Sequence, residues 1–178
     1  MRASARDLVV TAQGARFMGR TIPCALGRGG IGPKQGEGDR ITPVGRWRLL
    51  TVFYRAARLP PPEGRLPTFP TGLFDGWSDD PKDLFYNKRI RTMRPRSSHE
   101  NLRRPDPLYD IVVTTDFNAR PVIPGAGSAI FLHVWRAPRA PTAGCIAFRV
   151  ADLRWILARW QARSYLVIAG QDRPAPRK

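Results

Sequence analysis

The sequence has few cysteines and few histidines. Its 178 residues include two of each: Cys24 and Cys145, His99 and His133. None of these residues has the spacing of a metal site, so we predict neither a metal nor another cofactor. Two cysteines are enough for one disulfide, but their number does not show whether they pair.

Long apolar runs are also missing. No run approaches the ~20 residues that a helix needs to cross a bilayer, so no transmembrane segment is predicted. Charged residues interrupt the first ten positions before an apolar stretch of signal-peptide length can form. From the residues alone we expect a soluble chain with no visible export signal, which leaves a cytoplasmic location open.

Acidic residues are scarce relative to basic ones. The chain has 14 Asp and Glu against 30 Lys and Arg, nearly all arginine, for a net charge of +16. Such a surface suits nucleic acid, an anionic membrane or a carboxylate-rich polymer, but it is equally compatible with a solvated surface that has no partner. No basic block exceeds two consecutive residues, so the chain lacks an arm of the kind that grips nucleic acid.

The size and composition favour one folded domain with many loops. A hydrophobic fraction of 42% with five Trp and eight Phe argues against disorder, while 18 Pro and 16 Gly predict frequent turns. We predict a mainly β fold over residues 1–178, in which the Pro-rich stretch 171–178 is a flexible tail.

Local patterns predict where the strands and the helix lie. Leu153, Ile156, Leu157 and Trp160 recur at the spacing of one helix face and predict an amphipathic helix over 152–163. Gly- and Pro-rich composition predicts a long loop over 27–45 and an extended loop region over 58–107, with room for one short helix. Short apolar, β-branched runs predict strands at 8–11, 17–20, 21–26, 47–54, 108–115, 129–135 and 164–169.

A histidine in one of these strands precedes a Gly-Cys pair. Cys145 follows His133 by 12 positions. A thiol attacks a carbonyl as its thiolate, and a nearby imidazole can take the proton and stabilise the charge. Gly144 leaves room for a substrate beside the backbone, and amide groups around Cys145 could hold an oxyanion. By themselves, one histidine and one cysteine fit a histidine packed in the core somewhat better than a catalytic pair.

The two cysteines stand in different settings. Cys24 lies in the apolar run 22–26 and is expected to be a small buried hydrophobe. Only Cys145 has a neighbouring glycine and a candidate imidazole partner. We therefore expect Cys145 to be partly exposed with a lowered pKa, and Cys24 to be inert.

Two segments together resemble the L,D-transpeptidase (YkuD-like) catalytic domain. Phe-Leu-His-Val-Trp at 131–135 and Pro-Thr-Ala-Gly-Cys-Ile-Ala at 141–147 resemble the family's active-site pattern, a strand histidine followed by Ser/Thr-x-Gly-Cys. Upstream, Lys34, Gly38-Asp39 and the Thr-Pro-Val-Gly at 42–45 resemble the family's lead into Thr-Pro-x-Gly. The resemblance runs roughly from 8 to 168 and implies a β-sandwich with the cysteine and histidine in a groove.

This resemblance also implies an activity. Cys145 would be the nucleophile, His133 the general base, and Thr142 and Gly144 would shape the oxyanion site. The enzyme would form a thioester with a peptidoglycan stem peptide and pass the acyl group to an amine, in the periplasm or cell envelope. Its partners would be stem peptides, whose carboxylates arginine can bind bidentately, and inhibitors of the carbapenem class.

The sequence departs from the family's pattern at two positions. Ala143 and Ala147 stand where common members have histidine and Asn or Arg, which indicates a divergent branch. The candidate replacements are His99, Asn101, Arg103, Arg104 and Asp106, in a segment that equally fits a solvated polar loop. Trp135, two residues after His133, is a further candidate substrate-binding residue.

Two other functions stay open. Water could act as the acceptor at the same site, which would make the chain an L,D-carboxypeptidase or a hydrolase of cross-links. A basic nucleic-acid-binding module with an inert Cys145 belongs to a different class. Its phosphate binding would survive Cys145→Ala and fall steeply with salt, whereas an enzyme would lose turnover.

Overall fold

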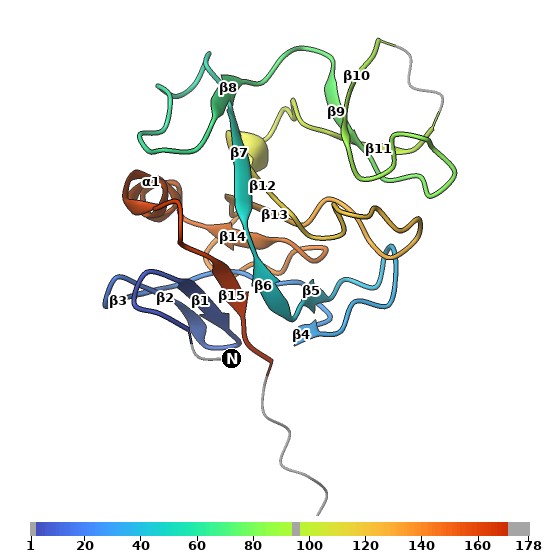
Figure 1. Cartoon of the computed structure of the whole chain (residues 1–178). Coiled ribbons are helices and arrows are strands. Elements are labelled where there is room, and N and C mark those ends of the chain that lie inside the picture. Colours follow the sequence, from blue (N-terminus) through green and yellow to red (C-terminus); the bar gives the residue numbers. More distant parts are fainter. Residues whose placement is uncertain (1–2, 94–96, 171–178) are drawn as a thin grey trace, which may run out of the picture.

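Two five-stranded sheets make up most of the structure (Figure 1), a computed structural model that describes residues 3–93 and 97–170. The first sheet has the order β3-β2-β1-β15-β6 and the second β14-β13-β12-β7-β8. The mainly β prediction is therefore confirmed. The strands of the first sheet are β1 (Leu8–Thr11), β2 (Gly14–Phe17), β3 (Arg20–Ile22), β15 (Leu166–Ile168) and β6 (Gly45–Trp47); those of the second are β14 (Ile146–Phe148), β13 (Phe131–Val134), β12 (Ile111–Thr115), β7 (Leu49–Tyr54) and β8 (Thr68–Pro70).

Smaller elements surround these sheets. A three-stranded sheet consists of β10 (Arg89–Arg91), β9 (Asp75–Ser78) and β11 (His99–Asn101). A pair of short strands, β4 (Ile31–Gly32) and β5 (Thr42–Pro43), joins the ends of the glycine-rich loop, and a 3-10 turn, η1 (Pro107–Tyr109), leads into β12. The single described α-helix is α1 (Val150–Arg159). No helix in the described ranges is long and apolar enough to cross a membrane.

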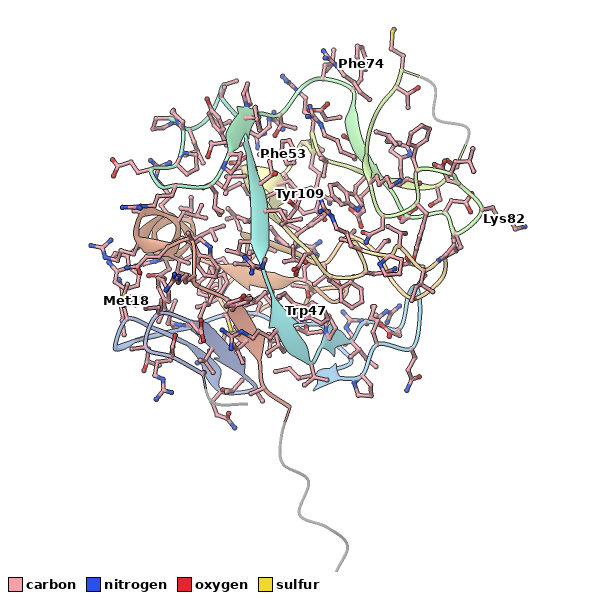
Figure 2. The ribbon with its side chains drawn as sticks, viewed as in Figure 1. Met18, Trp47, Phe53, Phe74, Lys82 and Tyr109 are labelled. Carbon is pink, nitrogen blue, oxygen red and sulfur yellow. The ribbon has the colours of Figure 1, made fainter. Side chains whose placement is uncertain are left out.

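The second sheet is covered on both faces. Every residue of β12 is buried, as expected for a strand packed on both sides. Alternate side chains face opposite ways: Ile111 and Val113 join the main core between the sheets and α1, whereas Val112 faces a smaller cluster with Phe53 and Phe131. Figure 2 labels Phe53 and Tyr109, two members of this smaller cluster, in the upper half of the view. The sheet β10-β9-β11 covers this smaller cluster.

Several element boundaries differ from the sequence prediction. The run 17–20 is a turn between β2 and β3, because Met18 and Gly19 both have positive φ. The predicted strand 47–54 is two strands: β6 pairs with β15 in one sheet and β7 with β12 in the other. The helix begins and ends earlier than 152–163, since Trp160 is already extended although its side chain stays in the core.

The region 58–107 was predicted as loop and instead contains β8 to β11. These strands have three or four residues each, and long-range pairing supports them rather than local pattern. The prediction also missed β14, which pairs in parallel with β13. The predicted tail 171–178 lies outside the described residues.

Candidate active site

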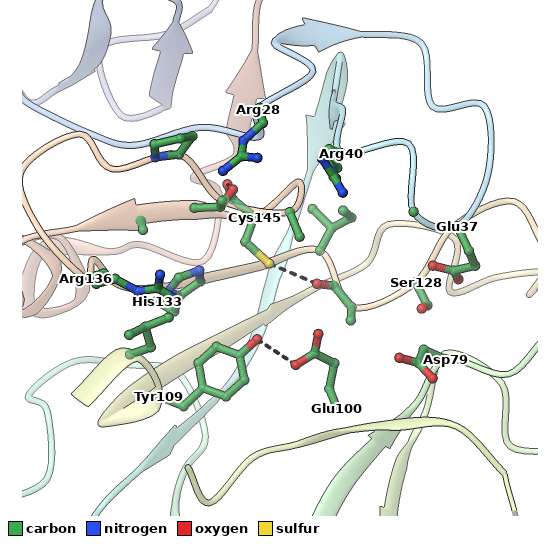
Figure 3. Close-up of a pocket in the computed structure, with 18 of the residues that line it drawn as sticks. Arg28, Glu37, Arg40, Asp79, Glu100, Tyr109, Ser128, His133, Arg136 and Cys145 are labelled. Atoms are coloured by element: carbon green, nitrogen blue, oxygen red, sulfur yellow. Dashed lines mark hydrogen bonds between the residues drawn. The ribbon is translucent and has the colours of Figure 1, made fainter. Parts of the chain in front are cut away.

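The parallel pairing of β13 with β14 brings Cys145 close to His133. In the register of this pair, Ala147 lies beside His133 and Phe148 beside Val134. Cys145 is two residues before Ala147, so its side chain projects from the same face as that of His133, one step diagonally along the sheet. Figure 3 shows the two side chains together at one side of a pocket.

The Cys145 thiol is held by backbone groups. Its Sγ donates to the Ala129 carbonyl oxygen at 3.1 Å and accepts from the Phe131 N–H at 3.4 Å. Burial raises the pKa of the thiol to about 12; the Phe131 N–H and Lys34 oppose this, while Glu100 adds to it. The residue is partly exposed, as expected. The expectation of a lowered pKa is wrong, since no adjacent cation outweighs the loss of solvation.

His133 is an uncharged base in the resting structure. Its side chain is buried, and Nδ1 lies 2.8 Å from the Val134 carbonyl oxygen. Because that oxygen can only accept, Nδ1 carries the proton and Nε2 is the nitrogen able to accept one. Burial, helped by the charge of Arg104, lowers the pKa of His133 to about 4, against the opposing effects of the Val134 and Leu108 carbonyls and of Asp106. Both members of the pair are therefore neutral.

A tight turn presents Cys145 to the pocket. The Thr142 hydroxyl donates to the Cys145 carbonyl at 2.6 Å and accepts from the Gly144 N–H at 3.1 Å. Gly144 has φ +137°, and a Cβ there would lie 3.0 Å from the Ile41 carbonyl oxygen. Thr142 thus fixes the turn, and only a glycine fits position 144 without backbone strain.

The Thr-Pro loop packs against this turn. Thr42 donates its hydroxyl to the Gly144 carbonyl at 2.9 Å and accepts from the Gly27 N–H at 2.8 Å. Gly27 lies so close that a Cβ would be 2.2 Å from the Arg40 carbonyl oxygen and 2.9 Å from Gly144 Cα. The upstream motif therefore acts as the support of the cysteine turn.

A cavity of about 620 Å³ opens above the thiol and is lined by side chains of both charges. Arg28 and Arg136 lie around the Cys145–His133 pair, while Glu37 and Asp79 lie together on the far side (Figure 3). The remaining charged lining residues are Lys34, Arg40, Glu100 and Arg104. The site can therefore bind ligands that carry both signs of charge.

Of the substrate-binding residues predicted in the segment 99–106, Arg104 is the one that lines the pocket. Asp106 holds its guanidinium by hydrogen bonds from Nε and Nη2, the shortest 2.8 Å, and this pairing raises the pKa of Arg104 and lowers that of Asp106. Its guanidinium carbon lies 5.3 Å from the centre of the Tyr109 ring. Asp106 thus orients Arg104 toward the site.

The other predicted substrate-binding residues are not in the described pocket wall. His99 and Asn101 flank Glu100 on β11, so the alternation of a strand turns both of them away when Glu100 faces the pocket. The Asn101 side chain accepts from the Arg103 N–H at 2.8 Å. Trp135 follows β13, and its backbone N–H donates to the Phe148 carbonyl at 2.9 Å.

Sequence reasoning missed Glu100 and Asn87. Glu100 accepts a hydrogen bond from the Tyr109 hydroxyl at 3.1 Å, and the Tyr109 ring packs edge-on against His133 at 5.3 Å. Asn87 accepts from the Ala129 N–H at 3.1 Å, so it positions the same residue whose carbonyl binds the thiol. Without strand assignments in 58–107, nothing in the sequence pointed to either residue.

A thiol and a neutral imidazole on one sheet face, under a charged pocket, form an arrangement found in cysteine acyl-transfer enzymes. Comparison with protein-family models matches residues 3–168 to the L,D-transpeptidase catalytic domain, YkuD. The match spans nearly the whole chain, so the chain belongs to this family, whose members act on the cell wall and are typically associated with the cell envelope. Neither a curated protein nor a solved structure matches the chain significantly.

Proposed function

We propose that this protein is a peptidoglycan L,D-transpeptidase in which Cys145 is the nucleophile and His133 the general base. The observation that supports this most directly is the position of the two side chains on one face of the β13–β14 pair, below the pocket. The Nδ1 contact with the Val134 carbonyl supports it further, since it fixes the tautomer in which Nε2 accepts a proton.

In the first step the donor stem peptide is cleaved. The Cys145 sulfur attacks the carbonyl carbon that precedes a D-configured residue, and the thiol proton moves to His133 Nε2. The C–N bond then breaks, the leaving amine takes that proton from His133, and a thioester remains on Cys145. Because both groups start neutral, proton transfer must accompany the attack.

In the second step an amine of a neighbouring stem attacks the thioester. Its nitrogen forms a bond with the carbonyl carbon and loses a proton to His133 Nε2. The C–S bond breaks, its electron pair returns to sulfur, and His133 passes the proton to the thiolate. The product is a cross-link between two stems, and the resting pair is restored.

The arginines of the pocket supply the anion binding that Ala143 and Ala147 do not. Arg28, Arg136 and the Asp106-oriented Arg104 lie near the pair and can bind donor carboxylates bidentately. In the family's common pattern, larger polar side chains stand at the two alanine positions. We propose that Arg104 takes over the positioning of the donor.

Mass spectrometry of muropeptides tests this function. Purified protein is incubated with peptidoglycan, and Cys145→Ala protein serves as the control. Cross-linked dimers that form only with the unmodified enzyme support transpeptidation. Trimmed monomers without new dimers would assign the hydrolase activity instead, and unchanged muropeptides would refute both.

A carbapenem provides a covalent probe of the same cysteine. By family resemblance we expect one drug molecule to add to Cys145, which intact-protein mass spectra before and after incubation would show. An adduct on Cys145→Ala protein would mean that another nucleophile reacts. The absence of any adduct would contradict the expected groove geometry.

A further inference from the structure

The side of the pocket away from Arg28 and Arg136 carries acidic residues from three separate segments. Glu37 comes from the glycine-rich loop, Asp79 from the end of β9 and Glu100 from β11. Tyr86 donates its hydroxyl to Glu37 and accepts from the Gly127 N–H at 3.0 Å. This wall is therefore built by tertiary contacts and is not a run of neighbouring surface carboxylates.

Two buried polar atoms in this wall have no partner. Within residues 3–93 and 97–170, neither Asp79 Oδ1 nor Ser128 Oγ makes a hydrogen bond. Ser128 has only 6% of its surface exposed and lines the pocket, and Figure 3 shows it between Glu37 and Asp79. It lies close enough to Tyr86 to lower the pKa of that phenol without forming a hydrogen bond of ordinary geometry. Buried polar groups without partners are costly, which points to a ligand that satisfies them.

The chemistry of this wall fits an ammonium group. The carboxylates only accept hydrogen bonds, the hydroxyl can accept one as well, and the negative charge favours a cationic donor; an ammonium group supplies three N–H donors. Lys34, a cation of the same pocket, is already bound to Asp39. Arg40 lies toward Glu37 (Figure 3), but no salt bridge joins it to the acidic wall within residues 3–93 and 97–170. No three His, Cys, Asp or Glu side chains in the described part of the chain converge closely enough to hold a metal ion.

We infer that Glu37, Asp79, Glu100 and Ser128 form a subsite for the ammonium group of the acceptor. This inference rests on the proposed function, in which arginines bind the donor's carboxylates beside the thiol. Cys145 lies beside the arginines and faces the acidic wall across the pocket (Figure 3), so a donor held by the arginines and an acceptor held by the acidic wall can meet at the thioester. Before the attack, the bound ammonium group gives one proton to a carboxylate of the wall, which leaves a neutral amine whose second proton goes to His133 during bond formation. The wall thereby favours an amine over water as the second substrate.

Binding is tested apart from turnover in Cys145→Ala protein. Cadaverine, a dication without a carboxylate, is titrated by calorimetry into that protein and into versions that also carry Asp79→Asn, Ser128→Ala or the control Asp80→Asn. Loss of one charge-assisted hydrogen bond should weaken cadaverine binding about tenfold for Asp79→Asn, less for Ser128→Ala, and not for Asp80→Asn. Ser128→Ala should also raise the melting temperature, since it removes an unpartnered polar atom. Equal affinities in all four proteins would refute the subsite, whatever the enzyme's activity.

The acceptor step gives the second readout. Acyl-enzyme formed from a stem peptide is treated with cadaverine or with hydroxylamine, which is mostly uncharged at neutral pH. Asp79→Asn should raise the half-saturating concentration of cadaverine about tenfold and leave that of hydroxylamine nearly unchanged. An equal loss for both amines would overturn the inference. Failure of stem peptides to acylate Cys145 would instead refute the proposed function and leave the binding experiment to decide the subsite.

Discussion

At the scale of single residues, the unusual property of the Cys145–His133 pair is that it carries no charge. Cysteine–histidine sites often hold a preformed thiolate and imidazolium. Here burial raises the thiol pKa to about 12 and lowers the imidazole pKa to about 4. A neutral pair reacts only when a substrate is placed against it, which protects the thiol from unrelated electrophiles.

Alkylation should reveal this neutral state. Iodoacetamide should modify Cys145 slowly at neutral pH, with a rate that rises about tenfold per pH unit past pH 9, because only the thiolate reacts. Cys24 is buried, with its pKa raised to about 11, and should react later still. Peptide mapping across a pH series measures both rates. A rate that levels off below about pH 8 would mean that a thiolate is already present.

His133→Ala should abolish acyl transfer. General-base assistance contributes roughly 10²–10⁴-fold, and a nucleophile and its base act as a unit, so Cys145→Ala and the double variant should be almost equally inactive. Turnover and thermal melting are measured together. If His133→Ala melts early but its folded fraction still cross-links stems, His133 is a packing residue.

His133 should also make stability depend on pH. The unfolded chain binds a proton at His133 below its ordinary pKa of 6.5, whereas the folded protein does so only near 4. The unfolded state thus binds more protons in this window, and the free energy of unfolding should fall by roughly 3 kcal/mol as pH drops through it. In His133→Gln protein the free energy of unfolding should not show this part of the fall as the pH drops. Urea unfolding of both proteins at about pH 7 and about pH 4 measures the difference.

At the scale of elements, the cysteine turn depends on the loop that packs behind it. Gly27→Ala should destabilise the protein by about 3 kcal/mol or more and reduce acyl transfer, since its Cβ would overlap the Arg40 carbonyl and press on Gly144. Gly32→Ala is the matched control, because its Cβ would meet only Ile41 at 3.8 Å. Urea unfolding and turnover of both variants test this. Equal stability and turnover of the two variants would show that the loop around residue 27 accommodates the added Cβ without loss of stability.

The sequence predicted the elements whose pattern is local. Runs such as that in β12 and the apolar face of α1 are visible in the residues, and the strand histidine followed by Thr-x-Gly-Cys pointed to His133 and Cys145, which the structure places on the same β13–β14 pair. The strands β8 to β11 were not visible, because three or four residues with mixed polarity become strands only through distant partners. For that reason the sequence pointed to His99, whereas Glu100 is the residue of β11 that lines the pocket.

At the scale of the whole molecule, the charge of +16 should make binding to an anionic polymer such as peptidoglycan depend on salt. Both the unmodified protein and Cys145→Ala should bind peptidoglycan sacculi at low salt and release them between about 0.1 M and about 1 M NaCl, as the Debye length falls from about 10 Å to about 3 Å. Sedimentation with sacculi measures the bound fraction. Tighter binding to duplex DNA than to sacculi, with no turnover of stems, would favour a nucleic-acid-binding module.

The position of β15 between β1 and β6 sets the order in which this molecule can fold. β15 pairs with β1 through Leu8 and Leu166, residues from opposite ends of the described chain, and its other edge pairs with β6. During synthesis β1 and β6 emerge long before the strand that joins them, so the first sheet stays open until β15 follows. Pairings of such high contact order form slowly, and until β15 is in place the unpaired edges of β1 and β6 can pair with other strands. Newly made chains should therefore depend on chaperones more than a protein with local strand pairing.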